Sequence, residues 1–140
     1  MMADALRVVL VDDEDLVRSG LRLLLSNAPD IEVVAEASNG RDAVATVLDA
    51  QPDVVLMDIR MPVMDGIAAV EKILSVHAVP IIMLTAFDTD SFILRALRAG
   101  AAGFLLKSTP PESLMAAVRA AAAGQPLLSP QVVDKLVSMQ

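Results

Sequence analysis

The sequence predicts an α/β fold in which a parallel β-sheet is covered by helices on both faces. Short runs such as residues 6–11 and 53–57 are mostly apolar, which is typical of central strands in a parallel sheet. Segments with apolar residues at helical spacing separate these runs. Five strand-helix units with right-handed crossovers give a doubly wound parallel sheet. The alternation alone does not give the strand order; we expect the flavodoxin-like order 2-1-3-4-5, because the second and fifth strands suit the edges of the sheet.

The first half of the chain contains three of the expected strands. After the strand at 6–11, residues 15–27 carry apolar side chains at helical spacing, and Pro29 ends that helix. The run at 31–37 alternates apolar and acidic residues, which favours an edge strand. A helix follows from Asn39-Gly40 to about residue 50, before the strand at 53–57.

The second half repeats the same alternation. We expect a helix over 66–76, a strand over 81–84, and a helix over 88–99 that closes on Gly100 as a left-handed cap. A strand at 103–106 is short enough to suit the other edge of the sheet, and a helix over 111–123 stops before Gly124 and Pro126.

Composition excludes several functions. The 140 residues suit one domain, with 55% hydrophobic residues to fill its core, and a net charge of −7 argues against direct nucleic-acid binding. There is no cysteine and the only histidine is His77, so a thiolate or histidine-rich metal site is excluded. No apolar stretch is long enough for a membrane span and no signal peptide is visible, so we expect a cytoplasmic protein without membrane contacts.

Three carboxylates follow two of the apolar strands. Asp12 and Asp13 come directly after the strand at 6–11, and Asp58 comes directly after the strand at 53–57. If the strands are neighbours, their carboxyl ends bring three negative charges together, and the repulsion raises a pKa unless a cation relieves it. A hard divalent cation, Mg²⁺ in particular, suits such oxygen ligands.

These residues, with others at matching spacing, resemble the receiver domain of bacterial two-component response regulators. The match covers about residues 6–124 and most resembles the NarL/FixJ/LuxR-type subgroup, which carries a C-terminal helix-turn-helix output domain. Five motifs carry it: Asp12-Asp13, Asp58 with Met61-Pro62, Met64-Asp65-Gly66, Thr85-Ala86, and Lys107.

The resemblance implies that Asp58 accepts a phosphoryl group from a phosphohistidine on a sensor histidine kinase, or from a small acyl phosphate. An aspartate that is ionised at neutral pH needs no general base, but it needs its charge neutralised. The domain is therefore expected to be a switch that phosphorylates and slowly dephosphorylates itself, rather than an enzyme.

The resemblance also implies the partners of Asp58. Asp13 would bind Mg²⁺ most directly, Asp12 would assist partly through water, and the backbone carbonyl of Arg60 would add a ligand. Lys107 and the hydroxyl of Thr85 would each contact a phosphoryl oxygen.

Phosphorylation in this family changes a distant surface. Thr85 would be pulled towards the phosphoryl group, and Phe104, which occupies the position of the family's aromatic switch residue, would fill the vacated space. The helix at 88–99, the strand at 103–106 and the last helix would then change shape. That change would control homodimerisation and transcriptional output, with DNA bound through the output domain.

The sequence also suggests how the switch is tuned. Ser108 follows Lys107 where many relatives have a proline with a cis bond, and we expect a trans bond here. Arg60 and Phe87 flank the route of an attacking water and cannot orient it, so we expect slow loss of phosphate. By analogy, kinase choice is expected on the first helix, with Leu16, Arg18 and Leu23 facing outward.

We expect residues 1–124 to form the receiver domain and 125–140 to follow it as a separate segment. In Leu127-Leu128-Ser129-Pro130, Ser129 before Pro130 is a good cap for the start of a helix, so the tail is a linker towards an output domain or a sixth helix. Two other functions stay open: a receiver-like module that dimerises without phosphorylation, and a phosphohydrolase that works through an aspartyl phosphate. The hydrolase is less favoured, because such enzymes usually carry a second carboxylate where Arg60 stands.

Overall fold

The predicted doubly wound fold is confirmed. The computed structural model describes residues 4–86, 90–125 and 127–128. The strands are β1 (Leu6–Val11), β2 (Ile31–Ala37), β3 (Val54–Met57), β4 (Ile81–Thr85), β5 (Gly103–Leu106) and β6 (Leu127–Leu128). The helices are α1 (Asp15–Leu25), α2 (Gly40–Ala50), α3 (Gly66–Leu74), α4 (Asp90–Ala99) and α5 (Pro111–Ala122).

The sheet is parallel throughout and follows the order β2-β1-β3-β4-β5-β6. The predicted order of the first five strands and the edge position of β2 are therefore confirmed. The predicted edge position of β5 is wrong, because Gly103 and Phe104 pair with Leu127 and Leu128. The predicted helix with Ser129 as its cap lies outside the described residues; the two residues before that cap, Leu127 and Leu128, extend the sheet as β6. The linker or sixth helix was predicted over 125–140, and of this range the structure describes only residues 125, 127 and 128.

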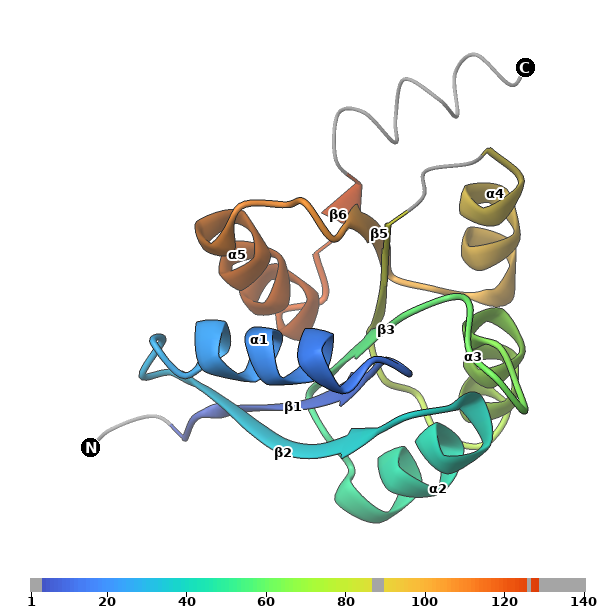
Figure 1. Cartoon of the computed structure of the whole chain (residues 1–140), viewed down its shortest axis with the longest axis horizontal. Helices are drawn as coiled ribbons and strands as arrows, with labels where there is room; N and C mark the ends of the chain where they lie inside the picture. Colours follow the sequence, from blue (N-terminus) through green and yellow to red (C-terminus); the bar gives the residue numbers. More distant parts are fainter. Residues whose placement is uncertain (1–3, 87–89, 126, 129–140) are drawn as a thin grey trace.

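Two helical layers cover the sheet (Figure 1). Helices α1 and α5 lie on one face, and α2, α3 and α4 lie on the other. Strand β1 shows why both faces need cover, since Val9 and Val11 belong to one core cluster while Val8 and Leu10 belong to the other. All four side chains are at most 2% exposed. The carboxyl ends of β1 and β3 thus emerge between two closed layers.

The helix bounds differ slightly from the prediction at three ends. Helix α1 stops at Leu25 and α3 stops at Leu74, each followed by a serine whose hydroxyl donates to a carbonyl three residues earlier. Such local bonds compete with helix continuation, which explains both early ends. Helix α5 ends one residue early, at Ala122. The predicted start of α4 at residue 88 falls outside the described residues, and its predicted close is confirmed by Gly100, with φ of +108°.

Within the described residues, no helix is long and apolar enough to cross a membrane.

Candidate functional site

The three predicted carboxylates meet at the carboxyl ends of β1 and β3. Each of Asp12, Asp13 and Asp58 offers an oxygen within 4.8 Å of the others. Asp12 and Asp58 are 2% and 7% exposed, whereas Asp13 is exposed to solvent. They meet because β1 and β3 are neighbours in register, with Val11 opposite Met57. The two strands pass their last residues directly into this cluster.

Lys107 compensates part of this negative charge. Its Nζ lies 2.7 Å from Asp12 Oδ2 and 3.2 Å from Asp58 Oδ2. The residue is placed by strand pairing, because the Lys107 amide donates to the Thr85 carbonyl at 2.7 Å. The peptide bond to Ser108 is trans, as predicted. One cation therefore bridges the ends of β1 and β3 from the end of β5.

The electrostatics of the cluster follow from burial and these contacts. Burial raises the pKa of the Asp58 carboxyl, the Lys107 ammonium lowers it, and the Asp12 carboxylate raises it again, with a net rise. For Lys107, burial lowers the pKa, but the bond to Asp12 and the attraction of Asp58 raise it overall. Lys107 therefore stays charged, while the negative charge on Asp58 remains costly.

Backbone contacts fix the Asp58 side chain and the loop behind it. The Ile59 amide donates to Asp58 Oδ1 at 2.8 Å, and the Asp58 amide donates to the Val11 carbonyl at 2.9 Å. Gly66 begins α3 so close to this loop that a Cβ there would lie 2.0 Å from the Asp58 carbonyl oxygen. Glycine is therefore required at this position. The Asp65 side chain caps α3 by accepting from the Ala68 amide at 2.8 Å.

A small cavity opens beside the carboxylates. Its volume is about 220 Å³. It is lined by Asp13, Glu14, Asp58, Arg60, Thr85, Ala86 and Lys107. Five of these seven were predicted as site residues; Glu14 and Ala86 were missed as lining residues, although each directly follows one that was named. Asp12 does not line the cavity, and Phe87 lies outside the described residues.

Thr85 and Phe104, the two residues of the predicted switch, lie on the neighbouring strands β4 and β5. Thr85 ends β4 and is 2% exposed, and its β5 partner is Leu106. Phe104 is fully buried and belongs to the core cluster that includes Ile93 and Ala96 of α4. The aromatic ring thus already fills space under α4 in this state.

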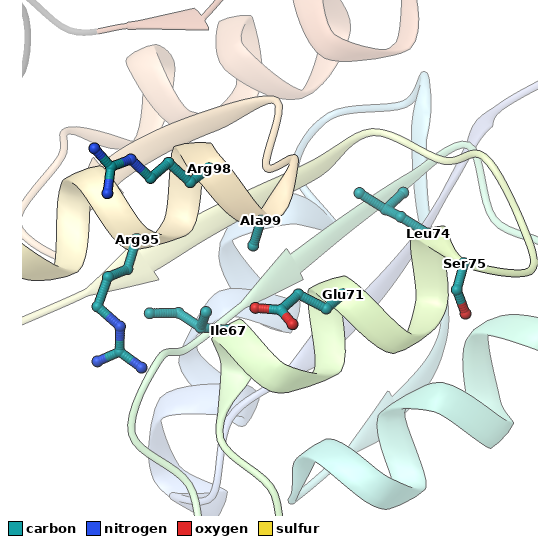
Figure 2. Close-up of a pocket in the computed structure, with 7 residues that line it drawn as sticks. All are labelled: Ile67, Glu71, Leu74, Ser75, Arg95, Arg98 and Ala99. Atoms are coloured by element: carbon teal, nitrogen blue, oxygen red, sulfur yellow. The ribbon is translucent and has the colours of Figure 1, made fainter.

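A larger hollow lies away from the carboxylates, between α3 and α4 (Figure 2). Its volume is about 570 Å³, and it is lined by Ile67, Glu71, Leu74, Ser75, Arg95, Arg98 and Ala99. Figure 2 shows Arg95 and Arg98 of α4 across from Glu71 of α3. None of the predicted site residues lines it, so the size of an opening does not mark the chemistry.

The first helix only partly matches its prediction. Leu16 and Leu23 are 85% and 71% exposed, as predicted. The prediction that Arg18 faces outward is wrong, because its guanidinium donates to the Asp12 carbonyl at 2.6 Å. Asp12 begins the acidic loop, residues 12–14, that follows β1. Arg18 also pairs with Glu36 of β2 at 3.1 Å. Local helical spacing does not show such a contact, because both partners come from other elements.

Comparisons with known proteins agree with this geometry. The response regulator receiver domain family matches residues 8–119. The chain is 43% identical over 141 residues to the uncharacterized transcriptional regulatory protein YxjL of Bacillus subtilis, covering 99% of this chain. It is 42% identical over 134 residues to the transcriptional regulatory protein LiaR of the same organism, covering 95% of this chain. The chain spans 64% of the length of each of these two relatives.

Solved structures show the same likeness. A LuxR-family two-component response regulator from Aurantimonas sp. superposes with a TM-score of 0.90 at 34% identity, covering 97% of this chain and 98% of that one. The receiver domain of the putative response regulator NarL from Mycobacterium tuberculosis gives a TM-score of 0.85 at 35% identity, covering 88% of this chain and all of that one. The chain therefore belongs to the response regulator receiver domain family.

Proposed function

We propose that this domain is a phosphorylation-activated switch in which Asp58 accepts a phosphoryl group from the phosphohistidine of a sensor histidine kinase. One observation carries the proposal: Asp58 is a buried carboxylate that opens into a small cavity, with a lysine on one oxygen and two further aspartates beside it. A purely structural aspartate has no need of this costly arrangement.

The transfer needs no acid or base from the protein. An Asp58 carboxylate oxygen forms a bond to phosphorus while the phosphorus–nitrogen bond of the phosphohistidine breaks. The electron pair of that bond goes to the imidazole. Lys107 already contacts Asp58 Oδ2 at 3.2 Å, so its ammonium supports the proposed contact with a phosphoryl oxygen on that carboxylate.

The donor set fits Mg²⁺. Three carboxylates with oxygens within 4.8 Å, one of them exposed, offer the hard oxygen ligands that this ion prefers. Asp13, Asp58 and the Arg60 backbone carbonyl would hold it, with Asp12 assisting. When bound, Mg²⁺ neutralises charge on the phosphoryl oxygens. Asp12 contributes besides by holding Lys107 at 2.7 Å.

Thr85 is proposed to start the response. It lines the cavity beside Asp58 and ends the strand that pairs with β5. Its hydroxyl would move towards the phosphoryl group and disturb the contact between β4, β5 and α4. Because Phe104 is already fully buried, its proposed role changes from an inward swing to repacking under α4. The surface formed by α4, β5 and α5 would then change shape when Asp58 is phosphorylated.

The downstream role is proposed from the relatives. YxjL and LiaR carry names of transcriptional regulators, and both are longer than this chain. We propose that phosphorylation controls homodimerisation and that an output domain of the helix-turn-helix type binds DNA. With a net charge of −7, the receiver itself is not the nucleic-acid surface. A cytoplasmic location fits this role.

Slow loss of phosphate is also proposed. Arg60 is exposed at the cavity rim and carries no carboxylate or carboxamide to orient a water molecule. The half-life of the phosphorylated domain in Mg²⁺, followed by intact mass, is expected to be minutes or longer. A half-life of seconds would contradict the proposed role of this position.

The experiment is incubation with acetyl phosphate and Mg²⁺, followed by intact mass and oligomeric state. We expect one stable phosphoryl group and a shift towards dimer, both lost with EDTA and in Asp58→Ala. An unchanged mass with constitutive dimers would support the phosphorylation-independent module instead. Rapid turnover of acetyl phosphate without a stable adduct would support the phosphohydrolase.

A further inference from the structure

Arg18 of α1 makes a set of contacts that the proposed phosphotransfer does not use. Its side chain is only 15% exposed, although it lies on a surface helix. Nη1 donates to the Asp12 backbone carbonyl at 2.6 Å, Nε contacts Glu36 Oε1 at 3.1 Å, and Nη2 pairs with Asp15. A solvated surface arginine does not spread its nitrogens over three elements of the fold.

The contact at Asp12 is the informative one. The carbonyl that Arg18 holds belongs to the peptide unit joining Asp12 to Asp13, so its direction sets how the Asp13 backbone leaves the end of β1. Asp12 is fixed on its other sides, because its amide donates to the Ala37 carbonyl at 3.1 Å and its Oδ1 accepts from the Glu14 amide at 2.9 Å. Asp13 is exposed, and its position depends on this backbone.

The far end of Arg18 is anchored to the sheet. Glu36 lies on β2 and accepts from both Arg18 and Arg22, one helical turn apart on α1. Glu36 and Asp15 also offset the positive charge of Arg18, so this charge does little to repel a cation bound nearby. The guanidinium thus acts as a rigid tie between the edge of the sheet and the acidic loop.

We infer that Arg18 is a positioning residue for the cation site: through the Asp12 carbonyl it holds Asp13 ready to bind Mg²⁺, and Glu36 holds Arg18. The inference rests on the proposed Mg²⁺ site and adds a residue to it. Groups behind metal ligands commonly change metal affinity by 10- to 100-fold when they are removed. Because Arg18 acts through the backbone and the ligand Asp13 is exposed, we expect the low end, on the order of tenfold.

The test measures Mg²⁺ affinity by calorimetric titration of the metal-free domain, with no phosphodonor present. Arg18→Met keeps the aliphatic part of the side chain and removes the guanidinium. Arg18→Lys keeps the positive charge but replaces the guanidinium by an ammonium. We expect both to weaken Mg²⁺ binding by about tenfold. If charge repulsion were the main effect, Arg18→Met would bind Mg²⁺ more tightly and Arg18→Lys would bind like wild type, and either result would overturn the inference.

Arg22→Met is the matched control, because Arg22 shares Glu36 with Arg18, whereas the donor to the Asp12 carbonyl is Arg18. It is expected to bind Mg²⁺ within about twofold of wild type. Glu36→Gln removes the anchor and provides a second variant that leaves Arg18 in place. It is expected to weaken binding, with little further loss when combined with Arg18→Met, since both act through one contact chain.

The outcomes separate the two proposals. Failure of the wild-type domain to bind Mg²⁺ would overturn the proposed cation site, and this inference with it. Wild-type binding with unchanged affinity in both Arg18 variants would overturn only the inference. Thermal unfolding without metal confirms that each titrated variant is folded, and a stability loss alone does not alter the affinity of the folded fraction.

Discussion

At the scale of single residues, Asp58 lines a cavity, yet its carboxylate is largely buried, and burial of a negative charge costs free energy. It is 7% exposed, and its nearest cation, Lys107, is shared with Asp12. One ammonium therefore serves two carboxylates, and burial still leaves the pKa of Asp58 raised. A function that needs a reactive anion accounts for this cost, whereas stability alone does not.

Replacing Asp58 by asparagine is therefore expected to stabilise the metal-free domain at neutral pH. The folded pKa of Asp58 lies above its unfolded value, so the native state loses stability as pH rises through the interval between the two. Asparagine does not ionise, so it avoids this loss. We expect the free energy of unfolding to rise by about 1 kcal/mol, the usual size of a single-residue effect. Lys107 keeps Asp12 as its partner.

Urea unfolding in EDTA measures the change for Asp58→Asn. The advantage of asparagine should be complete above the raised pKa and disappear below the ordinary carboxyl range. A variant that is less stable than wild type at pH 7 would show that the Lys107 contact outweighs the burial of Asp58.

At the scale of elements, the loop between β3 and α3 carries visible strain. Val63 has φ of +70°, a conformation that β-branched residues rarely adopt, and the Met64 amide donates to the Pro62 carbonyl at 2.7 Å across it. This is a tight, strained turn. The turn follows Asp58 in the chain and is held to α2, because the Gly40 amide donates to the Met64 carbonyl at 2.8 Å.

Val63→Asn is expected to stabilise the domain by about 0.5 to 1 kcal/mol, since asparagine tolerates positive φ better than valine. Val63 is 70% exposed, so little packing is lost. Val76→Asn is the matched control, at 62% exposure and without positive φ. Urea unfolding of both variants checks the account, and equal effects at the two positions would show that Val63 stores no strain.

At the scale of the whole molecule, sheet order brings the site together. Asp12 and Asp58 come from neighbouring strands, and Lys107 comes from a strand two places further along the sheet. Parallel strands deliver their last residues to one edge, and strands β1 and β3 flank the point where the strand order reverses. Asp12 lies 46 positions before Asp58 in the sequence, and Lys107 lies 49 positions after it. Lys107 nevertheless contacts both carboxylates.

The sequence predicted most of this arrangement because apolar periodicity and strand-end acids are local signals. The ranges of β1 and β2, and the meeting of Asp58 with Asp13, follow from such signals. Strand β6 was missed because the two-residue run Leu127–Leu128 has no period of its own and is ordered only by pairing with β5. The tie from Arg18 to Glu36 was missed because it depends on how α1 lies against β2.

The burial of Phe104 shows the same limit. Phe104 was predicted to fill the space that Thr85 vacates, but the position of its ring before phosphorylation depends on how α4 packs. Ile93 and Ala96 share its cluster, and only the assembled molecule shows that the ring is already enclosed. Long-range packing therefore decides the details of the switch, while local pattern decides where its chemistry lies.

The central claim is that Asp58 carries the phosphoryl group, and chemical mapping of the attachment site tests it most directly. After reaction with acetyl phosphate and Mg²⁺, borohydride reduces an aspartyl phosphate to homoserine, and peptide mass analysis locates the converted residue. We predict homoserine at position 58 and nowhere else. Conversion at Asp12 or Asp13, or a phosphoryl group that resists borohydride on a serine or threonine, would contradict the account.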